Sequence, residues 1–309
     1  MLDIALLGCG GMMPLSNRYL TALLCRLNGS LLLIDCGEAT QVTMKTLGWG
    51  FKNLDTICIT HFHADHISGL PGLLLMTANS GREDPITIIG PQGVAEIVRC
   101  LTVIASDLPF ELEFIEIPRG RREFSVSAHG YGVSALHLNH GAVCYGYSLS
   151  VPRGGKFDLE RAKALNLPVR FWNPLQKGSA VEFEGRTYTP DMVLGPARKG
   201  IKATYVTDTR PAPSIPDFAR GSDIFICEGL YGDPALSEKA REHKHMTFTE
   251  AARLAVAGGV SELWLTHFSP AMQNPKEFIG NARAIFPNTY CGYDRKTATI
   301  LFEDEDEAD

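Results

Sequence analysis

The sequence lacks the features of a membrane or secreted protein. No uninterrupted apolar run in its 309 residues approaches the ~20 residues that a membrane-spanning helix needs. The N-terminus enters an apolar stretch at once, without the basic start and the cleavage site of a signal peptide. The eight cysteines include no Cys-x-x-Cys pair, so we expect free thiols in a reducing compartment. We therefore predict a cytoplasmic protein without membrane contact.

The sequence also lacks an excess of positive charge, which at first argues against a nucleic-acid partner. Its net charge is −6. Six of the 35 acidic residues, however, lie in the C-terminal tail 303–309, and the remaining 29 equal the 29 basic residues. Affinity for nucleic acid depends on the cations that face phosphates rather than on the total charge. The composition therefore leaves an RNA substrate open.

One short segment is rich in metal-binding side chains. Residues 60–66 are Thr-His-Phe-His-Ala-Asp-His and follow an apolar run that is typical of a buried strand. Imidazole and carboxylate groups are ligands of Zn²⁺ and similar ions. His61 and His63 point to one side of an extended chain, and the turn after them presents Asp65 and His66 to a neighbouring point. The segment predicts a site for two adjacent metal ions.

Further ligands must come from distant loops, because these four residues cannot complete two coordination shells. Three candidates follow strand-like apolar runs, namely His140, Asp208 and His267. Each is weak alone, since a His or Asp at a strand end is commonly a cap or a turn residue. Together with the first motif they form a coherent set of seven ligand-type residues.

With these motifs the sequence resembles the ribonuclease Z family of the metallo-β-lactamase superfamily, from about residue 2 to residue 302. The metal motif alone identifies the superfamily. Three further elements point to ribonuclease Z: the run Gly69-Leu70-Pro71-Gly72, the run Leu194-Gly195-Pro196, and the pair Glu228 and His245. The resemblance implies an α/β protein with the αβ/βα four-layer sandwich of the superfamily and a protruding arm. It also implies an endoribonuclease that removes 3′ trailers from precursor transfer RNA.

The resemblance implies a role for each candidate residue. One ion would be held by His61, His63 and His140, the other by Asp65, His66 and His267, and Asp208 would bridge them. Two divalent ions, which we predict to be zinc, can hold a bridging hydroxide and stabilise both the attacking and the leaving oxygen of a phosphodiester. The predicted catalytic residues are Asp65, His245 and Glu228. His245 would protonate the departing ribose oxygen, and Glu228 would orient His245.

The segment 152–185 interrupts the strand pattern where family members carry the arm that grips transfer RNA, often across a dimer. It is locally basic, and its predicted RNA contacts are Arg153, Lys156, Arg170 and Lys177. A solvated insertion of loops and a helix would have the same pattern. Phe171 and Trp172 would either stack on RNA or form a small packed cluster. The resemblance also implies a homodimer.

The sequence departs from the family pattern at two places. The glycine-proline element of the arm tip is not recognisable, and residues 268–272, Phe-Ser-Pro-Ala-Met, stand where the family has an arginine-tyrosine pair. Both departures concern substrate contacts. A small-molecule phosphodiesterase, such as a cyclic-nucleotide enzyme, or another metallo-hydrolase of the superfamily therefore stays open as an alternative that needs no basic arm.

Two other classes are less well supported. A non-enzymatic binding module would be expected to lose ligands, whereas all seven positions are filled. A β-lactamase is disfavoured, because Asp65 and Asp208 match the phosphodiesterase type of two-metal site. We expect one catalytic domain, 1–302, that carries the arm and is followed by the acidic tail 303–309. Helices are expected at 37–47, 69–78, 93–104 and 247–257.

Overall fold

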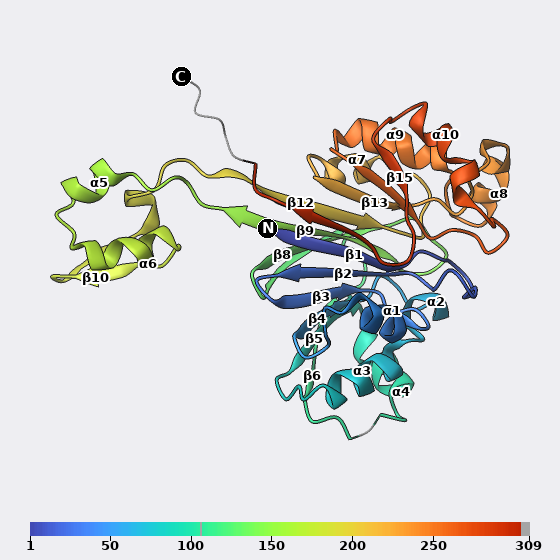
Figure 1. Ribbon diagram of the computed structural model, residues 1–309, viewed down its shortest axis with the longest axis horizontal. Helices are drawn as coiled ribbons and strands as arrows, with labels where there is room; N and C mark the ends of the chain where they lie inside the picture. The colour runs from blue at the N-terminus through green and yellow to red at the C-terminus, as the bar shows by residue number, and fades with distance from the viewer. Residues whose placement is uncertain (106, 304–309) are drawn as a thin grey trace. The chain divides into compact units, whose positions relative to one another are not determined.

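Two seven-stranded sheets carry most of the chain in this computed structural model, which describes residues 1–105 and 107–303 (Figure 1). The predicted acidic tail lies outside the described residues from position 304 onward. In order of neighbouring strands, the first sheet consists of β16 (Lys296–Ile300), β1 (Leu2–Gly8), β2 (Ala22–Leu27), β3 (Ser30–Ile34), β4 (Leu54–Cys58), β5 (Ile86–Pro91) and β6 (Leu112–Ile117). The second consists of β15 (Thr289–Cys291), β14 (Leu263–Thr266), β13 (Ile224–Glu228), β12 (Arg198–Val206), β9 (Tyr145–Arg153), β8 (Tyr131–His137) and β7 (Glu123–Ala128).

Each sheet contains a parallel set of strands. In the first sheet β3, β4, β5 and β6 run parallel to one another, and in the second β12, β13, β14 and β15 do so. Parallel strands end at a common edge, and loops at the carboxyl ends of such strands are where α/β sheets bind ligands. The loops after β4, β12 and β14 carry most of the predicted metal ligands.

Helices cover the outer face of each sheet, so the predicted αβ/βα arrangement is confirmed. Against the first sheet pack α1 (Thr40–Leu47), α3 (Leu70–Asn79) and α4 (Val94–Leu101). Against the second pack α7 (Ser214–Ala219), α9 (Phe248–Gly258) and α10 (Ile279–Arg283). All four predicted helices are present, but the one expected to reach residue 104 ends at Leu101. Thr102 is its C-cap, with the non-helical φ and ψ angles −96° and 14°.

The inner faces of the two sheets are joined by buried tyrosines. The hydroxyl of Tyr147 in β9 donates to the carbonyl of Ile59 at 2.8 Å. The hydroxyl of Tyr205 in β12 lies 2.8 Å from Oγ1 of Thr21. A buried phenol needs such a partner, so these bonds fix how the sheets face each other. Strand β1 is buried along its whole length, as expected of a strand covered on both sides.

A second unit is formed by residues Val151–Ile201 together with the chain from Leu301. It contains α5 (Leu159–Ala164), the 3-10 helix η1 (Val169–Phe171), α6 (Trp172–Gln176), the hairpin β10 (Val181–Phe183) and β11 (Arg186–Tyr188), and the 3-10 helix η2 (Pro190–Met192). At its neck the incoming and outgoing chains touch. The amide of Gly195 donates to the carbonyl of Lys156 at 2.8 Å, and a Cβ atom at Gly155 would lie 2.0 Å from the Gly195 oxygen.

The aromatic residues of this unit form its small core. Trp172 is half-buried, and its indole N–H donates to the carbonyl of Leu167 at 2.9 Å. Its ring centre lies 5.7 Å from that of Phe157, and Phe171 lies 5.4 Å from Phe183. Of the two alternatives for Phe171 and Trp172, the structure therefore favours the packed cluster.

The remaining helices are short. They are α2 (Ala64–Ile67), α8 (Ser237–Glu242) and the 3-10 helices η3 (Pro234–Leu236) and η4 (Pro275–Glu277). Within the described residues, none of the helices combines the length and the apolar character that crossing a membrane requires.

Candidate metal centre

All seven residues predicted as metal ligands come together in the first unit, which consists of Met1–Ser150 and Lys202–Ile300 and carries the two large sheets. His61, His63, Asp65 and His66 lie on the loop after β4 and on α2. His140 lies between β8 and β9, and the other two directly follow parallel strands of the second sheet, Asp208 after β12 and His267 after β14. Asp208 and His267 both have a positive φ, 52° and 57°. Such backbone strain is typical of functional sites, where the surrounding structure holds it in place.

Asp208 lies between two groups of ligand atoms. His61, His63 and His140 form one group with it, and their ligand atoms all lie within 4.8 Å of one another. The other group is Asp65, His66 and His267, at the same spacing. Oδ1 of Asp208 lies 3.2 Å from Nε2 of both His66 and His267. Its Oδ2 lies 3.7 Å from Nε2 of His61 and 3.8 Å from Nε2 of His140.

The donor atoms have the character of a cation site. Among the described residues, Nε2 of His61, His66 and His267 is buried without a hydrogen-bond partner, which is costly unless another group satisfies it. Burial lowers the pKa of His61 to about 2, with the nearby His66 adding to the effect, so His61 is neutral and can donate a lone pair. Burial works against the ionised form of Asp208, but the histidines His267 and His66 hold its pKa well below the usual range. Imidazoles around a carboxylate are a donor set that fits zinc-type coordination.

Asp35, which the sequence analysis did not assign to the site, orients two of these histidines. It is fully buried at the end of β3, and its Oδ2 lies 2.7 Å from Nδ1 of His66. It also accepts from the amide and the hydroxyl of Thr60, and that hydroxyl lies 3.0 Å from Nδ1 of His61. A partner on Nδ1 leaves Nε2 as the ligand atom. The signal in the sequence was an aspartate directly after the apolar run 31–34.

The loop after β1 closes one side of the site. The amide of Met12 donates to Oδ2 of Asp65 at 2.7 Å. Gly11 lies so close to the ring of His267 that a Cβ atom there would approach it to 2.6 Å. Gly11 is therefore required for the loop to reach both ligands. The side chain of Met12 stays exposed at the mouth of the site.

Arg18, which the sequence analysis did not assign to the site, secures the loop after His267. It is almost fully buried, and its guanidinium donates to the carbonyls of Ser269, Met272 and Gln273 at 3.1, 2.7 and 2.9 Å. It also lies over the ring of Phe268, at 5.7 Å from the ring centre. One buried cation thus fixes the chain immediately after a proposed ligand.

The predicted pair Glu228 and His245 is present beside the metal ligands. Nδ1 of His245 lies 3.2 Å from both oxygens of Glu228, which is fully buried at the end of β13. The ring of His245 stacks on that of His267 at 5.5 Å between centres. Arg210, a further residue that the sequence analysis missed, donates to the carbonyl of His245 and pairs with Glu250.

A cleft with a volume of about 540 Å³, here called the metal-site cleft, is lined by His245 and by five of the predicted ligands: His63, Asp65, His140, Asp208 and His267. The charge balance favours a protonated His245. Burial works against its cationic form, but the charge of Glu228 and the hydrogen bond to it outweigh burial and raise the pKa of His245 to about 9. At neutral pH the cleft therefore offers ligand histidines next to one imidazole that holds a proton.

Several known proteins are similar to this chain in sequence or in fold. The family model described as anti-Pycsar protein Apyc1 matches residues 2–105. The ribonuclease Z of Lachnospira eligens is 53% identical over 305 residues, which cover 99% of this chain and 100% of that protein. The crystal structure of human tRNase Z, short form, has a TM-score of 0.70 at 22% identity and covers 97% of this chain and 99% of that chain. The metallo-β-lactamase fold protein YhfI from Bacillus subtilis has a TM-score of 0.68 at 18% identity, with 96% and 98% covered. The two structural likenesses confirm the predicted fold.

Proposed function

The chain belongs to the ribonuclease Z family, and from this premise we propose that it is a metal-dependent endoribonuclease that removes 3′ trailers from precursor transfer RNA. The observation that carries the proposal is the position of Asp208 between two groups of ligand atoms, with a protonated His245 beside them. This combination suits the hydrolysis of an RNA phosphodiester, because charge develops on the phosphate and the departing ribose oxygen requires a proton.

The proposed metal ligands are the seven predicted residues, for two zinc ions. One ion would be held by His61, His63 and His140, and the other by Asp65, His66 and His267. Asp208 would contact both ions. The buried Nε2 atoms without hydrogen-bond partners support this assignment. When bound, the two ions supply an activated water and compensate charge on the phosphate. The protein contributes the fixed orientation of the imidazoles through Asp35 and of Asp65 through the Met12 amide.

His245 is the proposed general acid. Its Nδ1 is held by Glu228, so its other ring nitrogen is the one that gives a proton to the leaving ribose oxygen. Glu228 is in turn held by the amides of Thr209 and Met246, at 2.6 and 3.1 Å. Asp65 contributes to catalysis as a ligand whose carboxylate is locked in place. These bonds keep the acid oriented before the substrate binds.

The second unit is proposed as the arm that holds the transfer-RNA body. Arg153, Lys156, Arg170 and Lys177 are the proposed contacts, and the last three side chains are exposed. Arg153 is half-buried and lies over the ring of Phe302 at 5.1 Å from its centre, so its role would include holding the unit together. RNA contact here would rest on cations, because Phe171 and Trp172 are engaged in packing.

Two further proposals concern the state of the protein in the cell. All eight cysteines are free thiols, which supports a reducing compartment such as the cytoplasm. A homodimer stays a prediction from the resemblance, and sedimentation equilibrium of the purified protein would test it.

The deciding experiment is incubation of the purified, zinc-loaded protein with a 3′-extended precursor transfer RNA, followed by mapping of the product ends. We expect one cut at the trailer junction that leaves a 3′-hydroxyl on the transfer RNA. The matched control is the Asp208→Ala variant, which should give no product. Hydrolysis of cyclic nucleotides with no cleavage of precursor would instead support the small-molecule alternative.

A further inference from the structure

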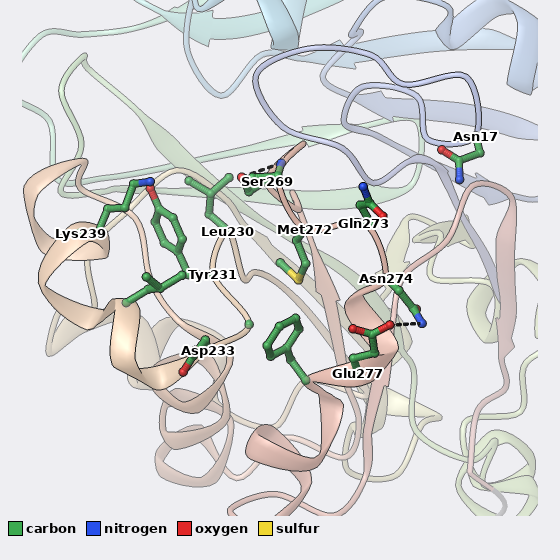
Figure 2. A pocket seen from close by; sticks show the side chains of 14 residues that line it. Asn17, Leu230, Tyr231, Asp233, Lys239, Ser269, Met272, Gln273, Asn274 and Glu277 are labelled. Carbon is green, nitrogen blue, oxygen red and sulfur yellow. Dashed lines mark hydrogen bonds between the residues drawn. The ribbon is translucent and has the colours of Figure 1, made fainter.

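A second cavity lies beside the metal-site cleft, and nothing in the proposed mechanism uses it. It has a volume of about 630 Å³, within the ~300–1,000 Å³ typical of small-ligand sites, and we call it the side cavity (Figure 2). It is built from the chain after β13 together with α8, and from the chain after β14 up to Phe278. Five residues line both hollows: Leu230, Tyr231, Lys239, Ser269 and Ala271. A ligand that occupies one hollow can therefore extend directly into the other.

The walls of the side cavity suit a flat heteroaromatic group. Tyr231, Met272 and Phe278 provide apolar and aromatic surface, and each is at least partly buried. Two amide side chains that can bond the polar edge of a base, Asn17 and Gln273, also line it, together with Asn274, whose amide donates to Glu277. Proteins that bind single-stranded nucleic acid use this combination, because every base has a face that stacks and an edge that hydrogen-bonds.

The charged side chains around the side cavity determine the orientation of a bound nucleotide. The ammonium group of Lys239 is exposed, lies 5.8 Å from the centre of the Tyr231 ring, and belongs to the wall shared with the metal-site cleft. Asp233 and Glu277 line the side cavity but not that cleft. Figure 2 shows Lys239 and Glu277 on opposite sides of the cavity. A phosphate is attracted to Lys239 and repelled by the carboxylates, so the backbone stays at the shared wall and the base points inward.

The cavity is held open by bonds that do not depend on a ligand. Arg18 fixes the carbonyls of Ser269, Met272 and Gln273, which belong to one wall. On the other wall, Asn281 donates to the carbonyl of Gly232 at 3.0 Å. Gly232 lies against Phe278, where an added Cβ atom would approach the Cβ of Phe278 to 2.5 Å. A preformed cavity binds without a large ordering cost.

We propose that the side cavity binds the base of one unpaired nucleotide next to the cleaved phosphodiester, while Lys239 contacts the intervening phosphate. This inference rests on the proposed function, because it supplies the substrate strand. Ala271 and Met272, from the segment 268–272, line this base-binding surface.

The test combines a blocked cavity with a missing base. Gln273→Trp places a bulky ring at an exposed lining position, and Gln273→Ala is the matched control that keeps the cavity open. Cleavage of precursor transfer RNA is measured with substrates that carry one abasic nucleotide at each position flanking the cut, on the transfer-RNA side and on the trailer side. We expect Gln273→Trp to lower kcat/KM by about 5- to 150-fold, the range that loss of one stacking contact gives, and Gln273→Ala to lower it much less.

Non-additivity identifies the occupant. At one flanking position, loss of the base should lower the kcat/KM of the parent enzyme as much as Gln273→Trp lowers it for the intact substrate. The variant acting on that abasic substrate should show no further loss of kcat/KM. That position tells whether the base comes from the transfer RNA or from its trailer. Additive losses at every position would overturn the inference while leaving the proposed function intact.

A binding measurement keeps the inference testable if precursor transfer RNA is not cleaved at all, which would contradict the proposed function itself. The probe is a single-stranded RNA trinucleotide. Its dissociation constant is measured by calorimetry with the zinc-loaded parent protein and with both Gln273 variants. Weaker binding with Gln273→Trp than with Gln273→Ala supports the side cavity as a base site. Equal binding by the two variants overturns it.

Discussion

Nδ1 of His245 lies 3.2 Å from each carboxylate oxygen of Glu228, and both residues are buried beside the proposed metal ligands. The carboxylate of Glu228 also accepts hydrogen bonds from two backbone amides, which hold it in its orientation toward the histidine. The imidazole is thus fixed in direction and charge before any substrate arrives. His61, a proposed metal ligand, differs from His245, because burial lowers the pKa of His61 and favours its neutral form.

Removing the proposed acid should slow RNA cleavage without removing metal. For His245→Ala we expect kcat for precursor transfer RNA to fall by roughly 10²–10⁴-fold, the range for loss of a general acid. A nitrophenyl phosphodiester has a leaving group that needs little protonation, so its hydrolysis should fall much less. Zinc content, measured by plasma emission, should stay at the parent value. An equal loss on both substrates would place His245 in a structural role.

Neutralising Glu228 should shift the pH profile. The charge of Glu228 helps to raise the pKa of His245 to about 9, and cleavage by a protonated acid is lost as the pH rises through that pKa. Glu228→Gln keeps the size of the side chain but removes the charge, so the pKa of His245 falls. The alkaline limb of the kcat profile should therefore move to lower pH, while activity below that limb changes less. A limb that stays in place, or moves upward, would rule out His245 as the group it reports.

Removing the proposed bridge should affect both ions. Asp208 approaches His66 and His267 with one oxygen and His61 and His140 with the other. For Asp208→Ala we expect zinc binding to weaken at both sites and hydrolysis of a nitrophenyl phosphodiester to be lost. Asp191, an exposed aspartate of the second unit, gives the control Asp191→Ala, which should retain two ions. Titration of the native protein to saturation at a single ion would contradict the paired site.

Arg18 should matter for stability and for the loop after His267. In Arg18→Met three carbonyls lose their donor, and an unsatisfied buried group costs about 1–3 kcal/mol. We expect the free energy of unfolding in urea to fall by about 3 kcal/mol and zinc affinity to decrease. Arg26→Met is the control, because Arg26 is more exposed and its ion pair with Asp3 should contribute about 1 kcal/mol or less. Equal losses in the two variants would show that burial of Arg18 has no special effect.

The sequence predicts the local parts of the site well and the supporting parts poorly. His61, His63, Asp65 and His66 share one short segment, so their spacing alone indicates a metal site. His140, Asp208 and His267 could be selected because each follows an apolar strand. Which ligands gather around which oxygen of Asp208 depends on how the two sheets face each other, and no spacing in the sequence encodes that.

The residues that were missed act over long separations. Asp35 lies 31 positions from His66, and Arg18 lies more than 250 positions from the carbonyls that it holds. Neither has a motif of its own, because an aspartate after a strand and an arginine in a loop are ordinary in any protein. The side cavity has no sequence signal either, since its two walls follow different strands. All four of the expected helices, by contrast, are present, with errors of a few residues at their ends.

Two predictions concern the second unit, whose chain enters and leaves at neighbouring glycines. Because Gly155 and Gly195 touch, replacing residues 156–194 by a short glycine-serine linker should leave β9 and β12 joined and all seven proposed ligands in place. We expect the variant to lose cleavage of precursor transfer RNA and to keep hydrolysis of a nitrophenyl phosphodiester, since only a large substrate reaches an arm. Unchanged cleavage of precursor would contradict the proposed arm.

Charge in this unit can be tested without deleting it. Lys156, Arg170 and Lys177 are exposed, and replacing all three by glutamine should weaken RNA binding and flatten its salt dependence. The slope of log K against log salt concentration should fall by about 0.7–0.9 for each phosphate contact that is lost. The matched control neutralises three exposed cations of the first unit, Lys45, Arg119 and Arg253, and should leave the slope closer to that of the parent protein. Equal flattening in both triple variants would mean that RNA binding follows the total charge, and the arm would then have no specific role in holding the substrate.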